Sequence, residues 1–281
     1  MPAAAGPRSP ASASARAVLG LIVSSALARI ALAAPLGLSV DESYTVAISR
    51  HFAWSYFDHP PLHVWLVGGW ARLLGREAPL LLRLPDILLF AASTWVMYRL
   101  TAALFGSRAG VWAALALNLT PLFTLAAAGG IVPDGPLVLF SLLAARAFAA
   151  SVLTPRSPTA ARGAMIGAGA VTGLALLSKY TAVSLPLSFG LFGASSRPRL
   201  LKSAAPWLAL LLAALLFLPV IVWNHAHGWV SFAFQGGRAR PLGLEFGRAL
   251  WGALGELLYL LPWIALALLA ALARALLSAV E

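Results

Sequence analysis

Long apolar runs, separated by short turns, are the feature of this sequence that most constrains its fold. Residues 109–133 and residues 203–237 contain no Asp, Glu, Lys or Arg. Over the whole chain 60% of the residues are hydrophobic and 10% are charged, whereas a soluble domain carries about 25% charged residues. Because a helix of about 20 apolar residues crosses a bilayer, the pattern excludes a soluble fold and predicts an all-α, multi-pass transmembrane helix bundle.

The charged and turn-forming residues between these runs predict about eight spans in one membrane domain over residues 17–281, after a cytoplasmic tail at residues 1–16. The first run, residues 17–34, is either a span or a signal peptide, and Arg29 within it favours a span. The later spans are expected at residues 83–104, 109–128, 137–153, 164–178, 181–195, 204–223 and 249–273.

A long first external loop, residues 35–82, separates the first two spans. Within it, residues 61–74 are apolar and contain two Trp, but they are too few for a confident span. They favour a helix that lies in the membrane interface on the outer side. If this segment crossed the membrane instead, Asp134 would face the cytoplasm while Asp41 stayed outside.

The charges divide between the two sides of this predicted topology. The net charge of +11 does not indicate a nucleic-acid partner, because membrane proteins concentrate Lys and Arg in their cytoplasmic loops. All five His and every acid except Glu281 fall on the opposite side. The chain has no Cys, which excludes a thiol nucleophile and a Cys-bearing metal site. The sequence therefore predicts one acidic, imidazole-rich face outside the cytoplasm.

Two adjacent carboxylates, Asp41 and Glu42, follow the first span. A carboxylate at the edge of the membrane, partly removed from water, is suited to act as a general base. Asp41 is therefore the candidate base, with Glu42 as a second catalytic candidate. The alternative is that Asp41 caps the helix that follows it, a common use of Asp.

Residues 54–62 combine aromatic side chains with an acid, an imidazole and two prolines. Pro60 and Pro61 fix the backbone and suit the start of the next helix. Asp58 and His59 could bind a divalent cation, or His59 could face a phosphate. The alternative is a turn before the prolines with a solvated His59.

Asp134 and Lys179 are isolated charges between apolar segments. An ionisable side chain at membrane depth indicates function by default, and a lone ammonium can pair with a phosphate. The alternatives are that Asp134 caps the following helix and that Lys179 extends its ammonium to the membrane surface.

His225 and His227 lie two residues apart in a segment that is also rich in aromatic residues. Two imidazoles at this spacing can share a metal only if other loops supply further ligands. Taken together, the candidate residues of these segments predict a site at the outer membrane surface. Such a site suits an amphiphilic, phospholipid-linked substrate whose tail stays in the bilayer.

Six segments carry a resemblance to a known family in both order and spacing: residues 41–44, 56–62, 83–85, 133–137, 176–180 and 223–236. The chain resembles the membrane glycosyltransferases of the GT-C architecture. Within them it is similar to glycosyltransferase family 39, the dolichyl-phosphate-mannose-protein mannosyltransferase-like group that includes the lipid A aminoarabinose transferases. The resemblance covers nearly the whole chain.

The resemblance implies an inverting transfer of a sugar from a polyprenyl-phosphate donor to a lipid, protein or envelope-glycan acceptor. It places the reaction on the periplasmic face of a bacterial inner membrane. By position, Asp41 is similar to the acid that deprotonates the acceptor hydroxyl, and Asp134 to a second acid that shapes the same site. No nucleic-acid partner is implied.

The donor phosphate is expected to contact His59, which stands where relatives have a basic residue before the loop proline. Tyr56 and Lys179 are further candidates for the same role. Asp58 and His225 are similar in place to residues that hold a metal in some relatives, and His227 is a third candidate ligand. A divalent cation is the one cofactor that the resemblance suggests.

Members of this family typically continue for several more spans, whereas this sequence stops at Glu281. We therefore expect it to be the N-terminal portion of such an enzyme. The alternatives are an inactive fragment and a transporter or flippase for a lipid-linked sugar. A transporter needs polar groups near the middle of the membrane, where only Arg29 and Arg146 are candidates.

Overall fold

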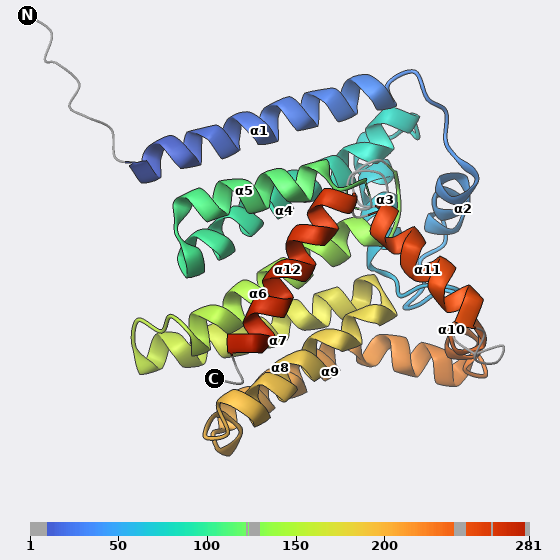
Figure 1. Ribbon diagram of the computed structural model, residues 1–281. Coiled ribbons are helices and arrows are strands. Elements are labelled where there is room, and N and C mark those ends of the chain that lie inside the picture. The colour runs from blue at the N-terminus through green and yellow to red at the C-terminus, as the bar shows by residue number, and fades with distance from the viewer. Residues whose placement is uncertain (1–9, 122, 124–129, 239–245, 260, 279–281) are drawn as a thin grey trace, which may run out of the picture.

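The predicted all-α fold is confirmed. The structure, a computed structural model, describes residues 10–121, 123, 130–238, 246–259 and 261–278, and these residues form helices joined by turns, with no strand among them. Figure 1 shows the helices packed as a bundle whose long members run roughly side by side.

Five helices in the described part of the chain are long and apolar enough to cross a membrane. They coincide with the spans expected at residues 17–34, 83–104, 137–153, 164–178 and 204–223. Their bounds are α1 Pro10–Ala33, α4 Pro79–Phe105, α6 Asp134–Val152, α7 Pro158–Ser178 and α9 Ala204–Ala226.

The remaining helices are shorter. Near the N-terminus they are α2 Val40–Ser49, α3 Leu62–Leu74 and α5 Ser107–Leu119. In the second half they are η2 Tyr180–Val183, α8 Ser184–Ser196, η3 Leu200–Lys202, α10 Val230–Arg238, α11 Phe246–Tyr259 and α12 Pro262–Ser278.

Three expected spans differ from the structure. The span expected at 109–128 begins as α5, which ends at Leu119, and residues 122 and 124–129 lie outside the described residues. Residues 181–195 form η2 and the 13-residue α8. Residues 249–273 belong to two helices, because Pro262 lacks the amide hydrogen that a continuous helix needs and Leu261 has a positive φ of 65°.

Helix α3 has 13 residues, so it is about 20 Å long at a rise of 1.5 Å per residue. The hydrocarbon core of a bilayer is about 30 Å thick. The helix expected at residues 61–74 is confirmed, and its length does not suffice for a span.

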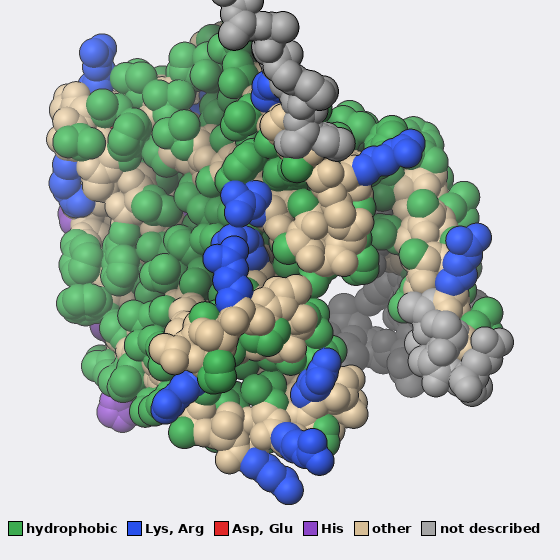
Figure 2. All heavy atoms as spheres, turned by 90° about the vertical axis from the view of Figure 1, so that its left-hand side faces the viewer, with side chains coloured by type: hydrophobic (Ala, Val, Ile, Leu, Met, Phe, Trp, Pro, Cys, Tyr) green, Lys and Arg blue, Asp and Glu red, His purple; other side chains and the backbone are tan. Residues whose placement is uncertain are grey.

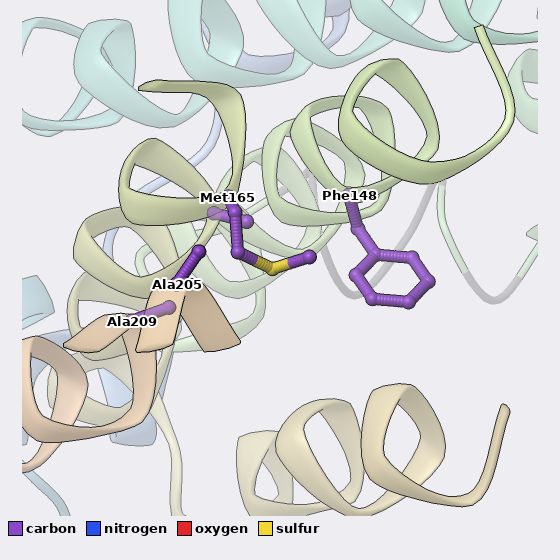
Figure 3. Packing of buried hydrophobic residues seen from close by; sticks show 5 residues of the cluster. Phe148, Met165, Ala205 and Ala209 are labelled. Carbon is purple, nitrogen blue, oxygen red and sulfur yellow. The ribbon is translucent and has the colours of Figure 1, made fainter. Parts of the chain in front are cut away.

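Small residues allow the long helices to approach closely. Helix α7 packs between α6 and α9, and α4 packs against α1, α5 and α6. Figure 3 shows Phe148 of α6 and Met165 of α7 with Ala205 and Ala209 of α9 in one buried cluster. Interfaces of this kind, with Gly and Ala at the contact, are typical of helices that pack in a membrane.

The two ends of the bundle carry different charges. The α4–α5, α6–α7 and α8–α9 turns lie at one end, which is the left side of Figure 1, and α2 and α10 lie at the other. Figure 2 looks onto the first end and shows Lys and Arg but no Asp or Glu side chain. We call it the basic end. The acidic end is the opposite one, with Asp41, Glu42, Asp58, Glu77 and Asp134.

Candidate functional site

A buried ion pair between Glu42 and Arg83 organises the acidic end. Both Glu42 oxygens accept hydrogen bonds from Arg83, at 2.6 Å from Nε to Oε1 and 2.6 Å from Nη2 to Oε2. The two side chains are 3% and 6% exposed. The remaining Arg83 donors bind the carbonyl oxygens of Ala33, Leu36 and Gly37. The pair therefore ties the start of α4 to the end of α1 and to α2.

Backbone amides complete the environment of Glu42. Ser39 N donates to Oε2 at 2.8 Å, and Ile131 N donates to Oε1 at 3.2 Å. Burial raises the pKa of Glu42, but Arg83 and these two amides outweigh it, so the pKa lies below its ordinary value. Glu42 is therefore a fixed carboxylate whose oxygens are already occupied.

Helix α2 is capped by Ser39. The Ser39 hydroxyl accepts a hydrogen bond from Glu42 N at 3.3 Å, while the Glu42 side chain binds Ser39 N. This reciprocal arrangement is a capping box. The alternative prediction that Asp41 caps this helix is therefore wrong, and the Asp41 side chain is not needed to start it.

Asp41 has the opposite environment from its neighbour. Successive residues on a helix point about 100° apart, so the side chain of Asp41 turns away from the buried position of Glu42. Asp41 is exposed, and within the described part of the chain it accepts no hydrogen bond and forms no ion pair. The other exposed or half-exposed acids that the structure describes at this end have partners: Glu77 binds Arg50, Asp58 binds Tyr44 and Asp134 binds Lys179.

Asp134 and Lys179 form a direct ion pair. Lys179 Nζ lies 2.8 Å from Oδ1 and 3.0 Å from Oδ2 of Asp134, and both side chains are about one-third exposed. Helix α6 begins at Asp134 without a side-chain cap, so the prediction that Asp134 caps it is wrong. The structure brings together two predicted site residues that lie 45 positions apart in the sequence.

A third group, His63, joins this region although the sequence reasoning missed it. His63 is 3% exposed, and its ring lies 5.5 Å from that of His59, nearly perpendicular to it. Burial lowers the pKa of His63 to about 3, and the positive charges of His59 and Lys179 contribute to the shift. The side chain is therefore neutral at pH 7. Its only signal in the sequence is its place in the first turn after Pro61.

The loop that carries Asp58 is held by α2 and α10. Tyr44 Oη donates to Asp58 Oδ1 at 3.1 Å, and Gln235 Nε2 donates to the Asp58 carbonyl oxygen. The rings of Phe57 and Phe234 are 4.7 Å apart. Burial, together with the Asp58 charge, raises the pKa of Tyr44 to about 12, so its hydroxyl remains a donor.

Tyr56 acts within the same loop. Its side chain is buried, with Oη donating to the His51 carbonyl oxygen at 3.0 Å and accepting from Ala53 N at 3.3 Å. The hydroxyl is thus used to fix residues 51–56. Tyr56 lies three residues before the predicted phosphate contact His59 in the chain, and its hydroxyl is directed into the loop.

The candidate metal ligands have other contacts. The His227 ring stacks on Trp223 at 4.0 Å, and His227 Nδ1 lies 2.7 Å from the Trp223 carbonyl oxygen. The His225 ring lies 5.8 Å from that of Trp229. Among the residues that the structure describes, no group of three or more His, Asp or Glu is arranged to hold a metal ion. Asp58, His225 and His227 are not assembled into such a ligand set.

Two solved structures share this fold. The crystal structure of ArnT from Cupriavidus metallidurans in the apo state has a TM-score of 0.57 at 23% identity, covering 74% of this chain and 41% of that one. The S. cerevisiae protein O-mannosyltransferase Pmt1-Pmt2 complex bound to the sugar donor has a TM-score of 0.56 at 19% identity, covering 78% and 34%. This chain thus spans less than half the length of either.

A search of curated proteins found no match. A family model gives the sequence evidence: that of the dolichyl-phosphate-mannose-protein mannosyltransferases matches residues 58–223, which is more than half of the chain. The expected resemblance is confirmed, and the multi-pass membrane fold agrees with it. The chain belongs to the dolichyl-phosphate-mannose-protein mannosyltransferase family.

Proposed function

We propose that this chain is a glycosyltransferase that moves a sugar from a polyprenyl-phosphate donor to an acceptor hydroxyl, with inversion at the anomeric carbon. Family membership supports transfer of a sugar, and five helices of membrane-spanning length support a lipid-linked donor. The excess of Lys and Arg at the basic end supports a cytoplasmic position for that end. The acidic end would then face the periplasm of a bacterial inner membrane.

The environment of Asp41 is the single observation that carries this proposal. A general base must accept a proton, so its oxygens must be free and accessible. Glu42, Asp58, Glu77 and Asp134 all have partners, whereas Asp41 is exposed and has none among the described residues. Glu42 is then a positioning residue, because its ion pair with Arg83 holds the helix that carries Asp41.

In the proposed reaction the Asp41 carboxylate takes the proton of the acceptor hydroxyl. The acceptor oxygen attacks the anomeric carbon from the face opposite the phosphate, a new glycosidic bond forms, and the bond between that carbon and the phosphate oxygen breaks. The polyprenyl phosphate leaves with the bonding electrons. No nucleotide is consumed.

Negative charge grows on the phosphate as it leaves, and fixed positive charge stabilises it. Lys179 is suited to this role because its ammonium carries three N–H donors. The two Asp134 carboxylate oxygens accept hydrogen bonds from this ammonium, which leaves a third donor for the phosphate. The His59 ring lies 5.5 Å from that of His63, and the charge of Lys179 lowers the pKa of His63, so His59 lies near the same region. Asp134 orients Lys179, and Tyr56 fixes the loop that leads to His59. Asp58, His225 and His227 do not form a ligand set among the described residues, so no step runs through a metal.

The test is transfer of a radiolabelled sugar from polyprenyl-phosphate donors by the full chain in proteoliposomes. Asp41→Asn should lower the rate at least about 100-fold, the contribution of a general base. Glu77→Gln is the matched control, since Glu77 is an exposed acid of the same end that already pairs with Arg50. It should leave the rate within about twofold.

An unchanged rate in Asp41→Asn would contradict the proposal, as would a lack of transfer by the unsubstituted chain with every donor. Movement of intact donor across the vesicle membrane without cleavage of the sugar–phosphate bond would instead favour a transporter.

A further inference from the structure

A cleft at the basic end collects three arginines from separate parts of the chain. It has a volume of about 590 Å³ and is lined by six residues near the end of α4, four residues of α6, two residues of the α6–α7 turn and two residues of α7. Arg99, Arg146 and Arg156 are among the lining residues, and no lining residue is an Asp or Glu. The cleft is therefore strongly positive.

The three guanidinium groups have no counter-ion in the described part of the chain. All three side chains are exposed. Arg99 lies 5.9 Å from the Trp95 ring, and no salt bridge to any of the three is present among the described residues. Like charges that converge on one cavity repel one another, so an anion in the cleft would relieve that repulsion.

Arg146 is not explained by the preference for basic residues in cytoplasmic loops. It lies inside α6, six residues before the last residue Val152, which places it about 9 Å from the end of the helix. Arginine within a membrane helix is costly and usually faces a functional partner. Here it faces a cleft that already holds two other arginines.

The rest of the lining identifies the class of ligand. Apart from the arginines, the walls are mainly Ala and Leu side chains of α4, α6 and α7, which suit an acyl chain or a glycerol backbone. Guanidinium groups bind phosphate oxygens through paired hydrogen bonds. We propose that this cleft binds the phosphate headgroup of an anionic phospholipid from the membrane leaflet at the basic end.

This site is separate from the proposed transfer site. Helix α6 begins at Asp134 and has 19 residues, so it is about 28 Å long. The cleft lies near its last turns, whereas the Asp134–Lys179 pair lies at its first. Binding at the cleft can thus be measured without any sugar donor.

The experiment titrates the purified full chain in detergent with phosphatidylglycerol, phosphatidylcholine or inorganic phosphate and follows the melting temperature. Phosphatidylglycerol should stabilise the chain, and neither other probe should do so at the same concentration. Arg146→Gln should weaken the apparent affinity about fivefold, and removal of all three charges about 100-fold. Arg146→Lys, which keeps the charge, should lose less than Arg146→Gln.

Arg108→Gln and Arg162→Gln are the matched controls, because both residues are exposed arginines of the same end that do not line the cleft. They should change the affinity by less than about twofold. Equal losses in the controls and in Arg146→Gln would overturn the site. Equal binding of phosphatidylcholine would overturn the requirement for an anionic headgroup, and equal binding of inorganic phosphate would overturn the lipid source.

Discussion

At the scale of single residues, burial determines which titratable groups of the acidic end can change their charge. Glu42 is buried and ionised because Arg83 and two amides surround it. His63 is neutral because burial lowers its pKa. The charged groups that shift this pKa further are His59 and Lys179, and none of them is an acid. Asp41 is exposed, and in the proposed reaction it is the residue that takes the proton of the acceptor hydroxyl.

His63 should make the folded chain sensitive to acid. Its pKa is about 3 in the folded state and about 6.5 in an unfolded chain. Between these values the unfolded chain binds a proton that the folded chain does not, so stability falls as the pH is lowered through this window. The slope due to His63 approaches about 1.4 kcal/mol per pH unit, and it is absent above pH ~7.

This prediction is checked by thermal unfolding in detergent between pH 3 and 7. His63→Gln should flatten the loss of stability in this window relative to the unsubstituted chain. His51→Gln, which changes an exposed histidine of the same loop, should leave the curve unchanged. Parallel curves for the unsubstituted chain and His63→Gln would show that His63 does not titrate as described.

The residue types of the site could be predicted from the sequence, but their partners could not. Asp41, Asp134 and Lys179 stand out as charges beside apolar runs. The difference in environment between exposed Asp41 and buried Glu42 depends on Arg83, which lies 41 positions after Glu42 in the chain. The Asp134–Lys179 pair likewise depends on how α6 and α7 pack. Such long-range contacts leave no local signal, and for the same reason His63 was missed.

At the scale of elements, the close approach of α7 and α9 depends on glycine. A Cβ on Gly169 would lie 2.5 Å from Ala209 Cα and would also strike the Ala209 carbonyl oxygen. A Cβ on Gly173 would lie 2.7 Å from Leu216 Cδ1, 2.8 Å from Leu216 Cβ and 3.2 Å from Ala213 Cα. At Gly169 the α9 atoms that a methyl group would strike belong to the backbone, so the two helices can accommodate the methyl group there only by moving apart.

Gly169→Ala should therefore lower the free energy of unfolding by about 1–3 kcal/mol, as overpacking does. Gly167→Ala on the same helix is the matched control. A Cβ there meets nothing within 4 Å, and Ala favours a helix over Gly by about 1 kcal/mol. Urea unfolding in micelles should show opposite shifts. A loss of similar size in both variants would contradict the packing described for α7 and α9.

Long uniform elements could be predicted from the sequence more fully than short ones. The five long apolar helices coincide with expected spans because about 20 apolar residues leave few alternatives in a bilayer. The break between α11 and α12 was not expected, since the run over 249–273 is apolar on both sides of Pro262. Composition gives the length of an apolar run. Whether the run forms one helix or two can depend on a single residue, which here is Pro262.

At the scale of the whole molecule, charge is sorted between the two ends of the bundle. The basic end presents Lys and Arg without a visible acid, and the acidic end holds Asp41, Asp134 and the groups around them. This sorting agrees with an even number of membrane crossings between Asp41 and Asp134, which is expected if residues 61–74 stay on the membrane surface. The proposed transfer site requires that Asp41 and Asp134 face the same compartment.

Cysteine accessibility tests this requirement most directly, because the chain has no Cys of its own. Asp41→Cys, Asp134→Cys and Lys202→Cys would each be treated in intact cells with a maleimide that does not cross membranes. Positions 41 and 134 should be labelled from outside, and position 202 only after the membrane is opened. Labelling of position 41 from outside, with position 134 reached only from the cytosol, would contradict the requirement.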